Sequence, residues 1–119
     1  MERRLRQRLC RYIESLARSS SWDSNFKMVA ILTRGGKIIS VGYNRQRPVP
    51  ARNVHAERDV IRKGSEGAVL YVCRVKGYRN QTLAMARPCE NCMRLIRKSK
   101  ISKVCYTNEF GVWEEMKIV

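Results

Sequence analysis

Apolar residues along this chain recur first with a helical period and then in short runs of strand length. Leu5, Leu9, Ile13 and Leu16 recur at helical spacing, so residues 3–17 are expected to form an amphipathic helix with arginines on its outer face. Four apolar runs of strand length follow, at residues 28–32, 38–43, 69–73 and 104–107. The third run is apolar almost throughout, which is typical of a strand at the centre of a sheet with both faces covered.

Glycine, proline and polar residues mark the connections between these segments. Residues 34–37 predict a hairpin turn, and residues 44–53, with two prolines and three arginines, predict a surface loop. A short helix is expected over residues 55–63, ended by Gly64. Residues 76–87 are expected to form another loop.

Pro88 favours the start of a further helix, in which Cys89, Cys92 and Ile96 share one face. After the run at 104–107, residues 108–111 indicate a tight connection. The remaining residues, 112–119, are expected to form a short closing strand or a turn of helix, and an antiparallel hairpin is the preferred prediction.

The length of 119 residues indicates a single domain over residues 1–119, because this is enough chain for one core and too little for a second lobe. No apolar stretch approaches the length of a transmembrane helix, and the charged start does not resemble a signal peptide. We therefore expect an intracellular protein without a membrane partner. The odd cysteine count of five argues against a disulfide framework, and Cys10, Cys73 and Cys105 are expected to be buried thiols.

The formal charge of +15 is large for a chain of this size. A basic surface attracts phosphate groups, on a free nucleotide or on single-stranded nucleic acid. The same charge also occurs on a well-solvated surface without a polyanionic partner, so composition alone leaves both interpretations open.

Three residues supply donors suited to a zinc ion. His55, Cys89 and Cys92 make three protein ligands, and catalytic zinc characteristically has three, with water or hydroxide in the fourth position. Glu57 lies two residues after the histidine, close enough to act as a proton carrier without being a ligand. The sequence therefore predicts one Zn²⁺ per chain at an open site. The alternative is a closed structural site with Cys73 or Cys105 as the fourth ligand.

His55-Ala56-Glu57 together with Pro88-Cys89-Glu90-Asn91-Cys92 resembles the His-x-Glu and Pro-Cys-x-x-Cys signature of zinc nucleobase deaminases. The chain is similar to the cytidine and deoxycytidylate deaminase superfamily. Val41-Gly42-Tyr43-Asn44 also falls where these enzymes carry a substrate-contacting asparagine. The resemblance implies an α/β fold, a three-layer α/β/α sandwich with a mixed sheet of about five strands, in which two helix starts carry the zinc motifs.

The resemblance also implies roles for individual residues. Glu57 is the expected catalytic acid and base, and Asn44, Ala56 and Pro88 are expected to contact substrate. Arg87 occupies the neighbourhood where many relatives have serine or glutamate, and we expect it to meet a substrate phosphate instead. Self-association into a homo-oligomer is a further implication.

The expected reaction is zinc-dependent hydrolytic deamination of cytosine to uracil on a free nucleoside or nucleotide, with a dCMP-like substrate favoured by the basic loops. A polynucleotide cytosine or adenine deaminase is the alternative that the net charge supports. A noncatalytic, zinc-stabilised nucleic-acid-binding module is the third. Phe110 and Trp113 are the aromatic residues expected at a pocket or partner interface.

Overall fold

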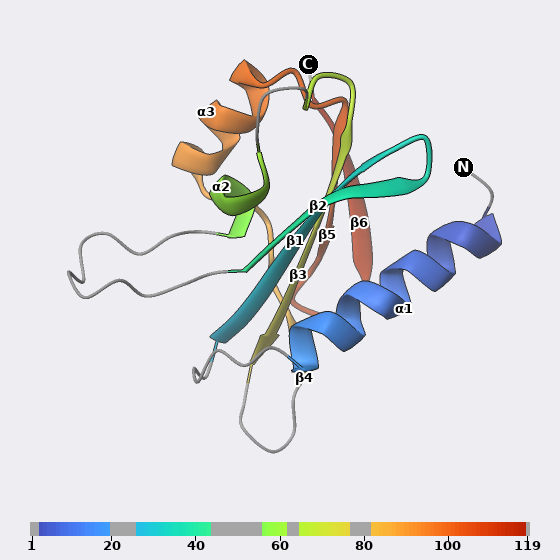
Figure 1. The fold of residues 1–119 in the computed structure, drawn as a ribbon. Coiled ribbons are helices and arrows are strands. Elements are labelled where there is room, and N and C mark those ends of the chain that lie inside the picture. The colour runs from blue at the N-terminus through green and yellow to red at the C-terminus, as the bar shows by residue number, and fades with distance from the viewer. Residues whose placement is uncertain (1–2, 20–25, 44–55, 62–64, 77–81, 119) are drawn as a thin grey trace.

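The computed structural model describes residues 3–19, 26–43, 56–61, 65–76 and 82–118. In chain order its elements are α1 (Arg3–Ser19), β1 (Phe26–Arg34), β2 (Lys37–Tyr43), α2 (Ala56–Val60), β3 (Val69–Lys76), β4 (Thr82–Ala84), α3 (Glu90–Lys98), β5 (Lys103–Thr107) and β6 (Trp113–Lys117). Figure 1 shows the strands as one twisted sheet with α1 on one side and α2 and α3 on the other. This is the α/β/α arrangement that the sequence predicts.

The sheet is mixed and has six strands, in the order β2-β1-β3-β5-β6 with β4 paired to β3. All neighbouring strands are antiparallel except β3 and β5, which are parallel. The five strands of the main path correspond to those expected from the sequence. The antiparallel pairing of β6 with β5 confirms the preferred prediction for the end of the chain.

Alternation along the strands divides the buried side chains between two faces. Ala30, Leu32, Leu70 and Val72 belong to a cluster that also contains Ala56, Val60, Met93 and Ile96 from α2 and α3. The intervening residues Val29, Ile31, Tyr71 and Cys73 pack with Ile13 and Ala17 of α1. We call these two sides of the sheet the α2/α3 face and the α1 face.

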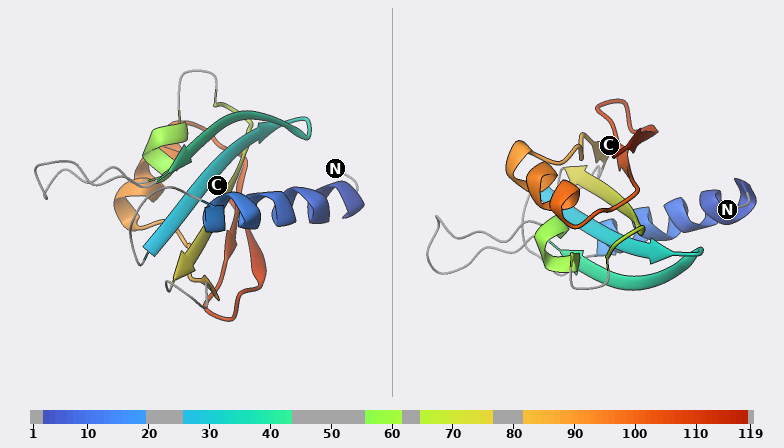
Figure 2. Two further views of the ribbon diagram at one scale, coloured as in Figure 1. Left: turned by 60° about the horizontal axis from the view of Figure 1, so that its bottom comes forward. Right: turned by 90° about the horizontal axis from the view of Figure 1, so that it is seen from above.

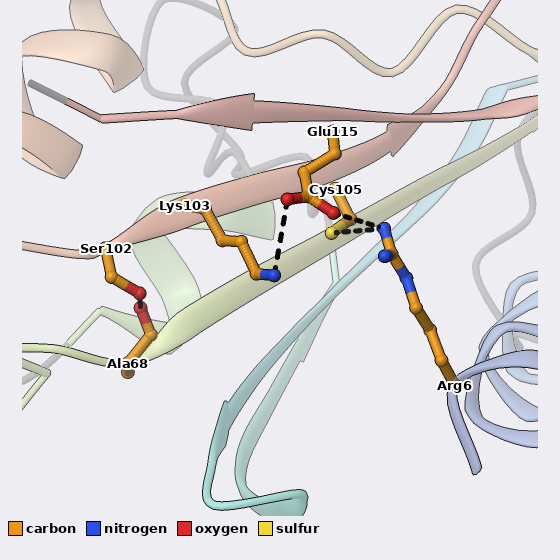
Figure 3. Close-up of polar contacts among 6 residues, drawn as sticks. All are labelled: Arg6, Ala68, Ser102, Lys103, Cys105 and Glu115. Atoms are coloured by element: carbon orange, nitrogen blue, oxygen red, sulfur yellow. Dashed lines mark hydrogen bonds and ion pairs between the residues drawn. The ribbon is translucent and has the colours of Figure 1, made fainter. Parts of the chain in front are cut away.

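A group of polar contacts ties the start of α1 to the edge of the sheet (Figure 3). Arg6 Nη2 lies 2.7 Å from Glu115 Oε2 of β6 and 3.5 Å from Cys105 Sγ of β5. Glu115 also accepts a hydrogen bond of 3.3 Å from Lys103 Nζ. Burial alone would raise the pKa of Glu115, but the hydrogen bonds from Lys103 and Arg6 outweigh it and lower this pKa. The contacts therefore hold Glu115 in its charged form.

The expectation of a loop over residues 76–87 is wrong, because part of this segment is in the sheet. β3 continues to Lys76, and β4 occupies Thr82–Ala84. A strand of three residues is too short to show a period in the sequence, and its pairing with β3 is what defines it. The expected loop at 44–53 and the helix end at Gly64 lie outside the described residues.

The thiols outside the zinc motif follow the sequence prediction in two of three cases. Cys73 and Cys105 are fully buried, whereas Cys10 on α1 is only partly covered. In the described ranges, no helix combines the length and apolar character needed to cross a membrane.

Candidate functional site

The cysteine pair is placed by the start of α3. Cys89 is the N-cap residue, with extended backbone angles of φ −70° and ψ 169°. Its carbonyl accepts the first helical hydrogen bond, 2.8 Å from the backbone nitrogen of Met93. The spacing of three residues puts Cys92 in the first turn, where it is 1% exposed, while Cys89 is exposed. Both residues thus lie at the N-terminal end of α3, which is the positive end of the helix dipole.

Glu57 lies in the first turn of α2 and is 2% exposed. α2 packs against β1 and β2 and contacts α3, and the two turned views in Figure 2 show these helices side by side. The contact between α2 and α3 brings Glu57 next to Cys92, and the side chains of these two residues share a hydrogen bond. A residue of the first motif and a residue of the second, 35 positions apart in the printed sequence, therefore meet between two helices.

The acidic side chains at this position disfavour one another's ionised forms. Burial raises the pKa of the Cys92 thiol, and the neighbouring Glu57 carboxylate raises it further, as do a hydrogen bond with Cys89 and the charge of that thiol. Like charges in a buried site disfavour each other's ionised forms, and a bound cation reverses this effect. The two cysteines supply sulfur, a donor that zinc prefers, and a cation bound to them would offset the repulsion between Cys92 and Glu57.

The third expected zinc ligand, His55, lies outside the described residues, directly before the first residue of α2. The described part of the chain holds no group of three or more histidine, cysteine or acidic side chains placed to bind a metal. Of the three expected donors only Cys89 and Cys92 are described, so the complete ligand set stays a prediction.

A closed zinc site with a third cysteine is excluded by the positions of the other thiols. Cys73 and Cys105 belong to the core cluster on the α1 face. The helix that carries Cys92 packs on the opposite face through Met93 and Ile96. The sheet separates them, so neither Cys73 nor Cys105 can complete a site at the start of α3.

The expected substrate residues divide by exposure. Ala56 and Pro88 are buried beside Glu57 and Cys89 in the chain, whereas Arg87 is exposed. Asn44 lies outside the described residues, as do the arginines of the loop before His55.

The two aromatic residues near the chain end do not behave as a pair. Trp113 packs against the α1-face cluster, with its ring centroid 6.1 Å from that of Tyr71 in an edge arrangement. Trp113 therefore lies on the other side of the sheet from α2 and α3, so the expectation of a pocket is wrong for this residue, and the alternative of a partner interface stays a prediction. Phe110 is 81% exposed in the connection between β5 and β6.

Two residues that the sequence does not single out hold the segment leading to the cysteine pair. Thr107, at the end of β5, and Arg74, on β3, make hydrogen bonds to residues Ala84, Met85 and Ala86. A threonine or an arginine near a strand end has no distinctive sequence signal, so only the contacts identify them.

Comparison with known proteins extends these observations. Residues 3–108 match the family model for the cytidine and deoxycytidylate deaminase zinc-binding region. A diaminohydroxyphosphoribosylamino-pyrimidine deaminase from Schizosaccharomyces pombe is 33% identical over 97 residues, which cover 69% of this chain and 20% of the relative. The chain thus spans about a fifth of the length of this relative.

Solved structures share the fold at lower identity. Cytidine deaminase from Burkholderia pseudomallei superposes with a TM-score of 0.68 at 20% identity, covering 98% of this chain and 93% of the other. The dCMP deaminase from cyanophage S-TIM5, in complex with dCMP and dUMP, superposes with a TM-score of 0.66 at 19% identity, covering 92% and 85%. Since the family model spans nearly the whole chain and includes both motifs, this protein belongs to the cytidine and deoxycytidylate deaminase zinc-binding family.

Proposed function

We propose that this chain catalyses the zinc-dependent hydrolytic deamination of cytosine to uracil on a free nucleoside or nucleotide. The observation that carries the proposal is the contact between the buried Glu57 carboxyl and the Cys92 thiol, at the start of the helix that also presents Cys89. The contact joins the expected proton carrier to the expected metal ligands, which come from two separate motifs.

In this proposal His55, Cys89 and Cys92 hold one zinc ion per chain. The chemistry that bound zinc supplies is activation of a water molecule, whose pKa falls towards 7. The chain's own residues supply the rest. Pro88 is buried and precedes the cysteine pair, so it limits how the segment before α3 can move, and Ala56 is buried at the start of α2.

Glu57 moves the protons. Its carboxylate takes a proton from the attacking water and delivers it to N3 of the cytosine ring, and a further transfer protonates the leaving amino group. A C4–O bond forms, the C4–N bond breaks, and ammonia and uracil are the products. Because Glu57 is only 2% exposed, bulk water has little access to the carboxyl and does not compete for these protons.

The substrate class follows from the residues around the site. Asn44 is proposed to contact the sugar, and the exposed Arg87 to contact a phosphate. A dCMP-like substrate is supported by this arginine, and the similar fold of the cyanophage enzyme, whose structure contains dCMP and dUMP, agrees with it.

Two other substrates have specific support. The net charge of +15 favours a polynucleotide substrate, which the enzyme would bind with a steep dependence on salt. The 33% identity to a diaminohydroxyphosphoribosylamino-pyrimidine deaminase favours a phosphoribosylated aminopyrimidine, whose exocyclic amine would leave by the same chemistry.

The test is a side-by-side assay of the zinc-loaded protein. Cytidine, deoxycytidine, CMP, dCMP, a cytosine-containing single-stranded oligonucleotide and the substrate of the yeast relative are each incubated with the enzyme, and the deaminated product and ammonia are measured. We expect dCMP to react fastest. A faster reaction of the oligonucleotide, weakened steeply by salt, would establish the polynucleotide alternative. No product from any compound, with zinc bound, would overturn the proposed reaction and leave deamination of adenine or of a modified base, or the noncatalytic module.

A further inference from the structure

The chain leaves the sheet for the cysteine pair at a junction between two strands. β1 pairs along the whole of one edge of β3, from Val69 to Lys76. The other edge is shared: β5 pairs with Val69–Val72, and β4 pairs with Arg74–Lys76. β5 runs parallel to β3 and its pairing ends opposite Val72, whereas β4 runs antiparallel and ends opposite Arg74, so the ends of the two strands lie on either side of Cys73.

Thr107 fills this junction. Its hydroxyl donates a hydrogen bond of 2.7 Å to the carbonyl of Ala84, the last residue of β4. The same oxygen accepts a hydrogen bond of 3.3 Å from the backbone N–H of Arg74. The Thr107 carbonyl accepts a further bond of 2.8 Å from the backbone N–H of Ala86. One fully buried residue thus joins the ends of β5 and β4 to β3.

Met85, which lies between Ala84 and Ala86, is also held by a hydrogen bond. The guanidinium of Arg74 donates a hydrogen bond of 3.3 Å from Nη1 to the carbonyl of Met85. Three successive residues, Ala84 to Ala86, therefore each have a backbone group bound by Thr107 or Arg74. Ala86 is fully buried and packs in the α2/α3-face cluster with Ala56.

Thr107 is itself fixed by the turn that follows it. The side-chain oxygen of Asn108 accepts hydrogen bonds of 2.8 Å from the backbone of Phe110 and 3.0 Å from that of Val112. Gly111 has a φ of +77°, and a Cβ there would lie 3.4 Å from Cβ of Leu83 on β4. The turn is thus closely packed on β4, which gives Thr107 a rigid position from which to act.

We propose that Thr107 is a positioning residue for the cysteine pair. This inference rests on the proposed zinc site. Only Arg87 and Pro88 separate the held segment from Cys89, and Pro88 restricts the backbone between them. Hydrogen bonds from the end of β5 therefore set where Cys89 and Cys92 lie relative to Glu57, although Thr107 is not itself one of the expected ligands.

The test measures metal binding in three variants. Thr107→Val removes the hydroxyl at nearly constant volume, and Thr107→Ser retains it. Thr33→Val is the matched control, because Thr33 is also buried and donates a hydrogen bond of 3.3 Å to a β3 carbonyl, that of Val69, at the end of β3 away from Arg74. Zinc affinity is measured by competition with a chromophoric chelator, and ligand geometry by the absorption spectrum of the Co²⁺-loaded protein. Unfolding of the metal-free variants measures the stability lost in each.

We expect Thr107→Val to bind zinc about 10-fold more weakly and to change the Co²⁺ spectrum, as happens when a group that orients metal ligands is removed. Thr107→Ser should restore both. Thr33→Val should lose less stability than Thr107→Val, because it removes one hydrogen bond instead of two, and its zinc affinity should be unchanged. Equal zinc affinity in Thr107→Val and the wild type would overturn the inference, as would equal weakening in Thr33→Val. Failure of the wild type to bind zinc would instead overturn the proposed function, and the inference with it.

Discussion

Replacing Glu57 by Gln separates the chemistry of the proposed site from its architecture. The side chain is 2% exposed and lies against Cys92, between α2 and α3. Glutamine has the same shape and the same number of heavy atoms, so the contact with α3 is expected to survive. Because the substitution creates no cavity, its cost in unfolding free energy is expected to be on the order of 1 kcal/mol, as for most point mutants. What the variant loses is the ability to accept and donate a proton.

The expected loss of turnover is large by comparison. Removing a positioned acid or base typically slows a reaction by about 10²- to 10⁴-fold. At about 1.4 kcal/mol for each factor of ten, this is about 3 to 5 kcal/mol of transition-state stabilisation. Since Glu57 is not among the expected ligands, the variant should bind zinc at one ion per chain, as the wild type does.

The assay combines initial rates of deamination, on the compound that the wild type converts fastest, with the metal content of the purified protein. Glu109→Gln is the matched control, because it makes the same chemical change at an exposed position in the β5–β6 connection. Its rate should equal that of the wild type. If Glu57→Gln keeps its full zinc content and more than about a tenth of wild-type turnover, Glu57 does not carry the protons, since an acid–base residue contributes at least about 10²-fold.

Three further predictions test the metal site and the α1 face. Cys89→Ala should lose zinc to a chelator at concentrations that the wild type withstands. Cys105→Ala removes a buried thiol on the other face of the sheet and should retain its zinc. Equal retention of zinc in both variants would show that Cys89 is not a ligand. Burial raises the pKa of Tyr71 from 10.0 to about 12, so its neutral form stabilises the fold fully below pH 10 and this contribution is lost as pH rises towards 12. In denaturant unfolding the wild type should therefore lose about 1 kcal/mol more than Tyr71→Phe between pH 9 and 11, and parallel pH profiles would contradict this cause. The lowered pKa of Glu115 acts in the opposite direction: its ion pairs stabilise the fold above its ordinary value of 4.5 and are lost as pH falls through the lowered value. Glu115→Gln should lower the free energy of unfolding by about 1 kcal/mol at pH 7 and by progressively less in acid. Glu66→Gln removes a longer and more exposed ion pair of 3.9 Å and should leave the free energy of unfolding almost unchanged. Equal losses in the two variants would show that the ion pair between α1 and β6 stabilises the fold no more than an exposed pair does.

The sequence predictions that the structure confirms depend on neighbours within a few positions. The helical spacing of Leu9 and Ile13 and the apolar run of β3 are local patterns, because burial on one face of a helix or on both faces of a strand repeats at a fixed interval. The two motifs are local patterns as well, although the roles of their residues stay predictions. Their residue types by themselves indicate a metal and a proton carrier, since few other side chains can perform that chemistry.

Features that depend on strand order are not predictable in this way. β4 exists because β5 ends early along β3 and leaves three residues of its edge open for pairing. Trp113 lies on the α1 face because of the register between β6 and β5, in which it pairs with Thr107. A shift of one residue in that register would move its ring to the other face.

The residue types at positions 55, 57, 89 and 92 thus predict the chemistry, and local periodicity predicts the elements that present them. Only the tertiary structure shows that Glu57 lies next to Cys92 and that Cys73 and Cys105 lie on the α1 face of the sheet. Only the tertiary structure shows that Thr107 binds the segment Ala84 to Ala86. The physical reason is that periodicity constrains which face of an element is buried but says nothing about which strand lies beside it. Strand order and register bring together residues that are distant in the chain, and these long-range contacts build the site.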